Sequence, residues 1–317
     1  MTDNEFLLQD RVQKIQQIIN KYGEDTFYLS FSGGKDSTVL SWLVDYALPN
    51  NTIPRVYANT GIELNMIRDF VFKKAESDKR IVIIKPTTPI KPMLEADGYP
   101  FKSKFHSRAV YEWQKGSKDN VLCTEYRTRT SIWNARKCPK KLLYQFNGEW
   151  DAIKISDKCC DRLKKEPLHN FSKETGRKNA IIGIMPAEGG RREKAVCLAF
   201  KGKNVNFQPL VPVTKEWEDW LIETFNIEIC DIYKPPYNFK RTGCKGCPFA
   251  LELQKELETL KKYFPAERKQ CEAIWKPVYE EYRRIGYRLK REDPPEQITI
   301  EDWLKDMENE KTTRKEI

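Results

Sequence analysis

Long apolar runs and histidine are what this 317-residue sequence has least of. No apolar run approaches the roughly 20 residues that span a bilayer, so we expect no membrane-embedded segment and no membrane partner. The N-terminus also lacks the charged-then-apolar layout of a signal peptide, which favours a cytoplasmic protein. With only two histidines, acid–base chemistry that depends on imidazole has little support.

A Walker A loop is missing as well, since the pattern G-x-x-x-x-G-K-S/T does not occur. A different glycine turn, Ser32–Ser37 (Ser-Gly-Gly-Lys-Asp-Ser), follows the apolar run 27–31 directly. This order predicts a strand, an anion-binding turn and the start of a helix, because Gly33 and Gly34 permit backbone dihedrals that turn successive N–H groups toward an anion. The alternative is an ordinary Gly-Gly turn between a strand and a helix.

The other residues of this turn suit a nucleotide phosphate. Ser32 and Ser37 can donate hydroxyl hydrogen bonds, and Lys35 offers a mobile positive charge to phosphate oxygens. Asp36 is placed to cap the helix or to hold Mg²⁺. We therefore expect an adenine nucleotide such as ATP to bind at Ser32–Ser37.

Strands alternate with helices in the first third of the chain. Strands are expected at 27–31, 56–58, 81–84 and 180–185, and helices at 5–23, 38–46 and 62–77. Thr214 is expected to cap a further helix, and 252–291 is helical with interruptions at Pro265 and Pro277. This alternation predicts a parallel sheet that binds ligands at the carboxyl ends of its strands. Residues at those ends are expected to line the nucleoside pocket: Asn59, Thr60, Gly61 and Gly183.

Positive charge is concentrated in an insertion at about 86–150. The net charge of the chain is +10, and residues 101–150 carry eleven Lys or Arg against four Asp or Glu, a balance of +7. Tyr111, Trp113, Tyr126 and Trp133 are interleaved with these charges. Basic residues among aromatics favour DNA or tRNA as a partner. A solvated basic surface, or a pocket for a small phosphorylated ligand, is the alternative. His106, in the same segment, is expected to touch phosphate or to lie on the surface.

Four of the nine cysteines have the spacing of metal ligands. The tandem pair Cys159-Cys160 and the turn Cys244-Lys245-Gly246-Cys247 can present four thiolates, which suit a 4Fe-4S cluster or Zn²⁺. A structural zinc site and unliganded thiols are the alternatives. The remaining cysteines have no ligand spacing, and of these Cys123 and Cys138, in the basic insertion, are candidate sulfur carriers.

These motifs together resemble a known superfamily. Ser32–Ser37 resembles the PP-loop of ATP pyrophosphatases, and the Cys-Cys…Cys-x-x-Cys pattern resembles the cluster ligands of adenylylsulfate reductases. The segment from Gly183 through Glu188 to Arg191 and Arg192 is similar to the family's Gly…Glu-Ser-x-x-Arg segment, although Gly189 stands where Ser is usual. The chain thus resembles the phosphoadenosine phosphosulfate (PAPS) reductase superfamily over roughly residues 25–250.

The resemblance implies a fold and a set of site residues. The fold is α/β, a Rossmann-like (adenine nucleotide alpha hydrolase-like) parallel sheet with helices on both faces, a basic insertion and a helical C-terminal region. Residues 1–250 would form the nucleotide-binding domain, with the Fe-S cysteines at 159–247, and 251–317 the helical region. Lys35, Asp36, Arg191 and Arg192 would be catalytic, the two arginines clamping a phosphate or the adenylate. The cofactors would be Mg²⁺, a 4Fe-4S cluster, and ATP or an adenylylsulfate-type nucleotide.

One departure from the reductases decides between functions. Those enzymes attack sulfur with a cysteine in a C-terminal Glu-Cys-Gly-x-His ending, whereas the last cysteine here is Cys271. The resemblance therefore favours members that act in DNA phosphorothioation or other thiolation. The predicted function is an ATP pyrophosphatase-type sulfurtransferase acting on nucleic acid, supplied by a cysteine desulfurase or another sulfur donor. One alternative is a sulfonucleotide reductase that forms sulfite. The other is a non-catalytic, nucleotide-sensing subunit that binds nucleic acid.

Overall fold

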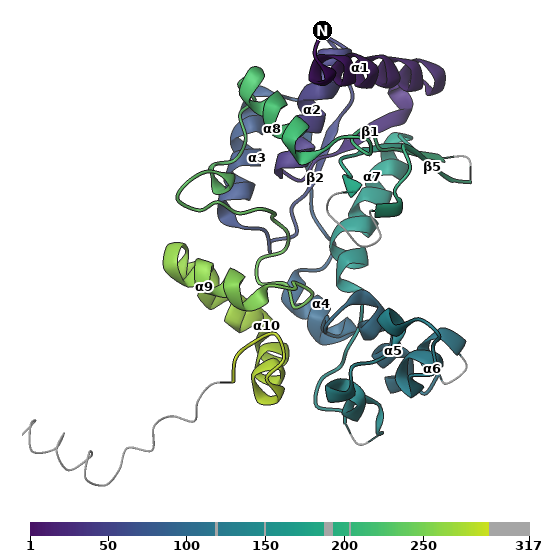
Figure 1. Ribbon diagram of the computed structural model, residues 1–317, viewed down its shortest axis with the longest axis vertical. Coiled ribbons are helices and arrows are strands. Elements are labelled where there is room, and N and C mark those ends of the chain that lie inside the picture. Colours follow the sequence, from purple (N-terminus) through teal and green to yellow (C-terminus); the bar gives the residue numbers. More distant parts are fainter. Residues whose placement is uncertain (118–119, 149, 187–192, 203, 292–317) are drawn as a thin grey trace, which may run out of the picture.

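The chain forms two lobes, one around a β-sheet and one made of helices (Figure 1). The computed structural model describes residues 1–117, 120–148, 150–186, 193–202 and 204–291. Within these residues no helix is long and apolar enough to cross a bilayer. The lobe with the sheet contains the two parts of the chain in which strands were predicted, residues 27–84 and residues 180–185.

A six-stranded sheet forms the centre of the first lobe, in the order β3-β2-β1-β4-β6-β5. All neighbouring strands are parallel except β5 and β6, which form an antiparallel hairpin. The predicted parallel α/β sheet is confirmed, whereas the hairpin was not predicted. The strands are β1 (Phe27–Ser30), β2 (Arg55–Ala58), β3 (Ile81–Ile84), β4 (Asn179–Ile182), β5 (Leu198–Lys201) and β6 (Asn204–Phe207).

Helices cover both faces of this sheet, as predicted. Phe27 and Leu29 of β1 point into a core shared with α1, α2 and α8. Tyr28, between them, points to the opposite face and meets Phe171 of α7 edge to face, with ring centroids 5.8 Å apart. The helices of this lobe are α1 (Asp3–Tyr22), α2 (Lys35–Ala47), α3 (Asn65–Ser77), α7 (Glu166–Thr175) and α8 (Lys215–Thr224).

Two sequence-distant segments build the helical lobe. The basic insertion and the C-terminal helices share one hydrophobic core, in which Tyr282 of α10 donates a hydrogen bond from its hydroxyl to the carbonyl of Pro248 and accepts one from the amide of Lys102. Pro265 begins α10 as predicted, but the interruption expected at Pro277 is wrong, since α10 continues through it. The helices are α4 (Ile90–Asp97), α5 (Lys104–Gln114), α6 (Val121–Thr128), α9 (Leu253–Tyr263) and α10 (Pro265–Ile285).

His106 lies inside this second core, so the expectation of a surface or phosphate-contacting residue is wrong. Its Nδ1 is 2.9 Å from the Tyr126 hydroxyl and its Nε2 is 2.7 Å from Gln145 Oε1. Burial lowers the pKa of His106 to about 3. Ser103 caps α5 and accepts a hydrogen bond from the His106 amide, which places the ring on the inner face of the helix.

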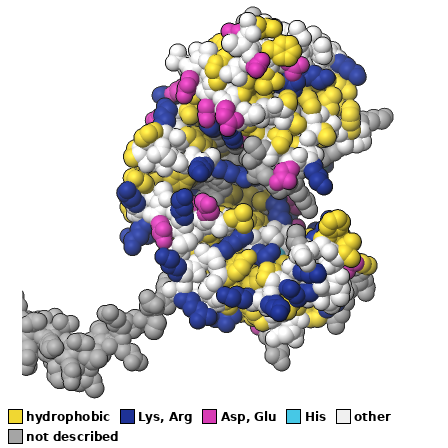
Figure 2. Space-filling view, viewed as in Figure 1, with side chains coloured by type: hydrophobic (Ala, Val, Ile, Leu, Met, Phe, Trp, Pro, Cys, Tyr) yellow, Lys and Arg dark blue, Asp and Glu magenta, His cyan; other side chains and the backbone are white. Residues whose placement is uncertain are grey.

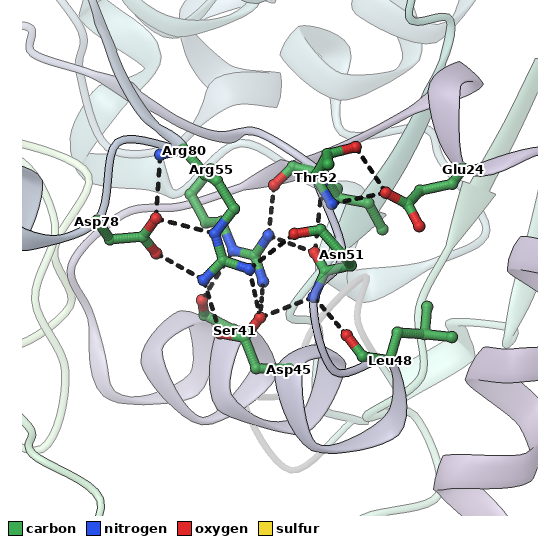
Figure 3. Close-up of polar contacts among 10 residues, drawn as sticks. Glu24, Ser41, Asp45, Leu48, Asn51, Thr52, Arg55, Asp78 and Arg80 are labelled. Carbon is green, nitrogen blue, oxygen red and sulfur yellow. Dashed lines mark hydrogen bonds and ion pairs between the residues drawn. The ribbon is translucent and has the colours of Figure 1, made fainter.

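A buried arginine ties β2 and β3 to the end of α2 on the side of the sheet away from the strand carboxyl ends (Figure 3). The Arg55 side chain donates to Asp45 Oδ1 at 2.6 Å, to Asn51 Oδ1 at 2.7 Å and to Ser41 Oγ at 3.2 Å. Arg80 shares Asp45 with it, at 2.7 Å. Each charge in this network is paired, so the network holds the strand starts in place.

Candidate functional site

The loop Ser32–Ser37 connects β1 to α2 at the carboxyl end of the sheet. Gly33 has φ +70°, and a Cβ there would come within 2.5 Å of Val71 Cγ2, so only glycine fits. The hydroxyl of Ser37 accepts a hydrogen bond from the Ser32 amide at 3.2 Å and donates one to the Gly34 carbonyl at 3.0 Å. This holds the loop around the first turn of α2, whose N–H groups have no partners within the helix. The geometry is that of an anion-binding turn.

Both charged residues of the loop are paired with α8. Lys35 Nζ lies 2.8 Å from Asp219 Oδ1 and 3.2 Å from Glu218 Oε2. Asp36 Oδ1 lies 2.7 Å from Lys215 Nζ. These three α8 residues were not foreseen. The sequence predicted a helix capped by Thr214, which is confirmed by a 3.2 Å hydrogen bond from the Trp217 amide to its hydroxyl, but not that the helix reaches this loop.

Glu218 is the buried centre of this charge network. Its side chain is 0% exposed, and its Oε2 lies 3.1 Å from Lys215 Nζ as well as close to Lys35. Its other oxygen, Oε1, is buried without a hydrogen-bond partner among the described residues. Burial, followed by the neighbouring charge of Asp36, raises the pKa of Glu218 to about 7.

The residues after β2 form a second tight turn beside the first. Glu63 accepts hydrogen bonds from the Thr60 amide at 3.1 Å and from the Thr60 hydroxyl at 2.5 Å. Gly61 has φ +77°, and its amide donates to Asn59 Oδ1 at 3.3 Å. The predicted pocket residues Asn59, Thr60 and Gly61 thus lie together at a strand end, and their contact with a nucleoside stays a prediction.

Gly183, at the end of β4, passes close to α2. A Cβ there would come within 3.3 Å of the Asp36 carbonyl oxygen, so its small size lets the two segments approach. The predicted phosphate clamps Arg191 and Arg192, together with Glu188 and Gly189, lie outside the described residues.

The tandem cysteines begin the helical stretch that leads into α7. Cys159 and Cys160 precede one π-helical turn, η4 (Asp161–Lys165), which continues as α7. Such turns bend a helix locally and are frequent at functional sites. A hydrogen bond from the Cys159 thiol lowers the pKa of Cys160 to about 6, whereas that bond and burial raise the pKa of Cys159.

The C-x-x-C turn is attached to the loop after β2. Cys244 forms an antiparallel bridge with Glu63, and the Lys245 amide donates to the Ile62 carbonyl at 2.7 Å. Gly246 has φ +59°, and a Cβ there would come within 2.8 Å of Cys271 Sγ. The turn therefore requires glycine and lies next to the turn that follows β2.

Helix α10 holds the same turn from the other side. Trp275 Nε1 donates to the Lys245 carbonyl at 3.1 Å, and the Tyr279 hydroxyl donates to the Gly246 carbonyl. Lys245 Nζ and Glu267 Oε2 form a buried ion pair at 3.1 Å. The C-terminal helix thereby fixes the backbone that carries Cys244 and Cys247.

All four predicted cysteine ligands influence one another electrostatically. Burial raises the pKa of Cys244 to about 11, with a contribution from the charge of Cys160, and burial together with Cys244 raises the pKa of Cys247. Cys159 is affected by both Cys247 and Cys244. Across the described ranges, no group of three or more His, Cys, Asp or Glu has the arrangement that would hold a metal ion. The four thiols are close enough to affect one another's pKa but do not form such a group, and their ligand role stays a prediction.

A cavity of about 90 Å³ lies between the loop Ser32–Ser37 and the residues just before the C-x-x-C turn. It is lined by Ser32 and the end of β2 on one side and by Lys164, Thr242 and Gly243 on the other. The neighbouring Cys244 raises the pKa of the Lys164 ammonium, so this side chain stays positive beside the thiols. The cavity therefore reaches from Ser32 of the glycine turn to Gly243, the residue before Cys244.

The other cysteines of the insertion are enclosed in the second core. Cys123 and Cys138 are both buried, and burial raises the pKa of each thiol, that of Cys138 to about 11. Neither thiol has the exposure and thiolate character that a sulfur carrier requires.

Comparison with known proteins gives matches among solved structures alone. No family model and no curated protein matches the chain. A phosphoadenylyl-sulfate reductase from Candida auris in its phosphate complex is 12% identical, with 77% of this chain and 96% of that chain covered and a TM-score of 0.46. An FMN adenylyltransferase from Candida glabrata is 14% identical, with 75% and 61% covered and a TM-score of 0.44.

A third match is the U34-tRNA thiolase from Methanococcus maripaludis with its 4Fe-4S cluster. The thiolase is 14% identical, the match covers 93% of this chain and 83% of the thiolase chain, and the TM-score is 0.36. By its own topology the chain is an α/β protein with a mostly parallel six-stranded sheet, and these three proteins are solved structures to which it is similar.

Proposed function

We propose that the chain is an enzyme that transfers the adenylyl group of ATP to an acceptor oxygen, after which sulfur replaces the adenylate. The observation that carries this proposal is the cavity that joins Ser32 of the nucleotide loop to Lys164, Thr242 and Gly243 beside the cysteines. A nucleotide held by its phosphates at the loop would have its reacting end directed into that space. Activation and sulfur transfer would then share one site.

In the first step an acceptor oxygen attacks the α-phosphorus of ATP, a new P–O bond forms, and the bond to pyrophosphate breaks. The N–H groups at the start of α2 and the Lys35 ammonium stabilise the charge that develops on the leaving pyrophosphate. Asp36 would hold the accompanying Mg²⁺, with its carboxylate shared with Lys215. In the second step sulfur at the hydrosulfide level bonds to the acceptor and AMP leaves with the bonding electrons.

The cysteines support a bound metal centre through their chemistry. Four thiols, two just before η4 and two in the C-x-x-C turn, make up the donor set that 4Fe-4S clusters and structural zinc share. Cys159, Cys160, Cys244 and Cys247 would hold the cluster, and Lys164 would face it with a positive charge. A bound cluster supplies iron–sulfide chemistry next to the cavity.

The basic insertion supports nucleic acid, either DNA or tRNA, as the acceptor. Lys and Arg side chains gather over the helical lobe in Figure 2. Lys104, Arg136, Lys140 and Lys141 are exposed. Trp133 is 61% exposed among these cations, which suits a base-stacking contact with a polyanion.

The first test is anaerobic purification followed by iron, sulfide and zinc analysis, with pyrophosphate release from ATP measured on the same sample. About four irons per chain and pyrophosphate release that DNA or tRNA stimulates are expected. Sulfite release from adenylylsulfate without ATP turnover would instead identify a sulfonucleotide reductase. ATP binding without either product would identify a non-catalytic subunit.

Two variants assign the roles within this test. Lys35→Ala is expected to lower pyrophosphate release by at least about ten-fold, with Lys73→Ala, an exposed lysine of α3, as the matched control. Cys244→Ser is expected to lose the metal, while Cys197→Ser keeps it, because Cys197 lies apart from the four ligands on the hairpin side of the sheet. Full metal content in Cys244→Ser would remove Cys244 from the ligand set.

A further inference from the structure

Helix α8 brings a second lysine to the phosphate-binding loop. Figure 1 shows α8 beside α2, and Lys215 Nζ lies 2.7 Å from Asp36 Oδ1 in the first turn of α2. Lys35 Nζ and Lys215 Nζ lie 3.2 and 3.1 Å from the same oxygen, Oε2 of Glu218. The two ammonium groups are therefore at most about 6.3 Å apart (3.2 plus 3.1 Å).

Two like charges at this separation repel each other, and a buried carboxylate between them is what lowers their energy. Glu218 serves this purpose although it is 0% exposed and its Oε1 has no partner among the described residues. A buried oxygen without a partner costs free energy, so the fold tolerates an unfavourable group in order to keep both lysines at the loop.

Each lysine retains a donor for a further anion. An ammonium group has three N–H donors, and Lys215 directs two of them at Asp36 and Glu218. Its third donor faces Met185 Sδ at 3.5 Å, which is a weak acceptor. Lys35 directs donors at Glu218 and at Asp219, whose side chain is 57% exposed and is free to turn into solvent.

We propose that Lys215 is a second phosphate-binding residue, that Glu218 positions both lysines, and that Asp219 holds Lys35 only until a polyphosphate replaces it. The inference rests on the proposed function, because it assumes that Ser32–Ser37 binds phosphate. Phosphate oxygens carry more charge than one carboxylate and can accept from both lysines, so they displace the exposed Asp219 and leave the buried Glu218 in place. The proposal makes α8 part of the site that binds pyrophosphate.

The test is titration of the full-length protein and its variants with inorganic pyrophosphate by calorimetry. Lys35→Met and Lys215→Met are each expected to bind pyrophosphate at least about ten-fold more weakly, because each loses a charge-assisted hydrogen bond. The matched control Lys73→Met removes an exposed, carboxylate-paired lysine of α3 and is expected to bind like the wild type. Binding by Lys215→Met equal to that of the wild type would overturn the proposal.

A double-mutant cycle keeps the proposal testable if Lys215→Met fails to fold. Asp219→Asn changes an exposed side chain and is expected to tighten pyrophosphate binding about three-fold, because it removes the competitor for Lys35. In the Lys35→Met background the same change is expected to have no effect. Tightening that persists without Lys35 would contradict the proposed competition.

The outcomes also separate this inference from the proposed function. A wild-type protein that binds neither pyrophosphate nor ATP overturns both. Weaker binding by Lys35→Met with unchanged binding by Lys215→Met, and no effect of Asp219→Asn, overturns the inference and leaves the nucleotide site standing.

Discussion

The two hydrophobic cores of this chain are assembled from different kinds of segments. The core around the sheet joins residues 8–71, which include α1, β1 and α2, to residues 181–229, which include β6 and α8. The second core joins the basic insertion to α9 and α10, which lie more than a hundred residues further along the chain. The loop Ser32–Ser37 belongs to the first core, and the C-x-x-C turn is held by the second. The candidate site thus lies where a core built on a β-sheet meets a core built from helices.

The two cores also differ in the buried polar group that each contains. The sheet core contains the Arg55 cation, which Asp45 and neighbouring amide and hydroxyl oxygens neutralise (Figure 3). The second core contains His106, which is kept neutral between Tyr126 and Gln145. The second arrangement is lost when the imidazole must take up a proton.

The largest effect on the free energy of unfolding is expected when the buried Arg55 cation is removed. Arg55→Met should lower the free energy of unfolding by about 3 kcal/mol, at the lower end of the range for a broken buried pair, because Asp45 keeps Arg80 as a partner. Urea unfolding measures this change. The control Arg68→Met removes an exposed arginine paired with Asp69 and should change stability by less than about 0.5 kcal/mol. Equal effects of the two substitutions would contradict the role assigned to Arg55.

Acid should act on the second core through His106. The folded-state pKa of about 3 lies below the unfolded value of 6.5, so its contribution is complete above pH 6.5 and is lost as the pH falls toward 3. Between pH 7 and pH 5 the loss should be about 2 kcal/mol. Urea unfolding at both pH values should show the wild type and the exposed-residue control His169→Gln losing about 2 kcal/mol more than His106→Gln, since the opposite effect of Glu218, whose pKa is raised to about 7, is common to all three. A loss of the same size in His106→Gln would show that another group is responsible.

The smallest effect is expected at the contact between α10 and the C-x-x-C turn. Tyr279→Phe removes the hydrogen bond to the Gly246 carbonyl and should lower the free energy of unfolding by about 1 kcal/mol. Tyr46→Phe, which removes the hydroxyl of an exposed tyrosine on α2, serves as the control and should leave stability unchanged. A Tyr279→Phe variant as stable as the wild type would mean that α10 holds the turn by packing alone.

Much of the sheet lobe could be predicted because its signals are local. The apolar run before Ser32, the two glycines and the helical periodicity after them define β1, the loop and α2 within some twenty neighbouring residues. Gly33 and Gly246 occupy positive-φ positions where only glycine fits, so composition and backbone geometry agree there. The hairpin of β5 and β6 was missed, since two four-residue strands carry too little pattern to stand out.

Tertiary packing decided what surrounds those local features. The partners of Lys35 come from α8, more than 180 positions away, and no periodicity in either segment announces the contact. His106 became a buried neutral residue because α10 and the insertion close over it. The sequence determined the glycine turn and the spacing of the cysteines, because both depend on backbone conformation and side-chain type along the chain. Only the fold decided which charges face the loop and that one cavity reaches from Ser32 to Gly243, because burial and pairing depend on segments that meet only in three dimensions.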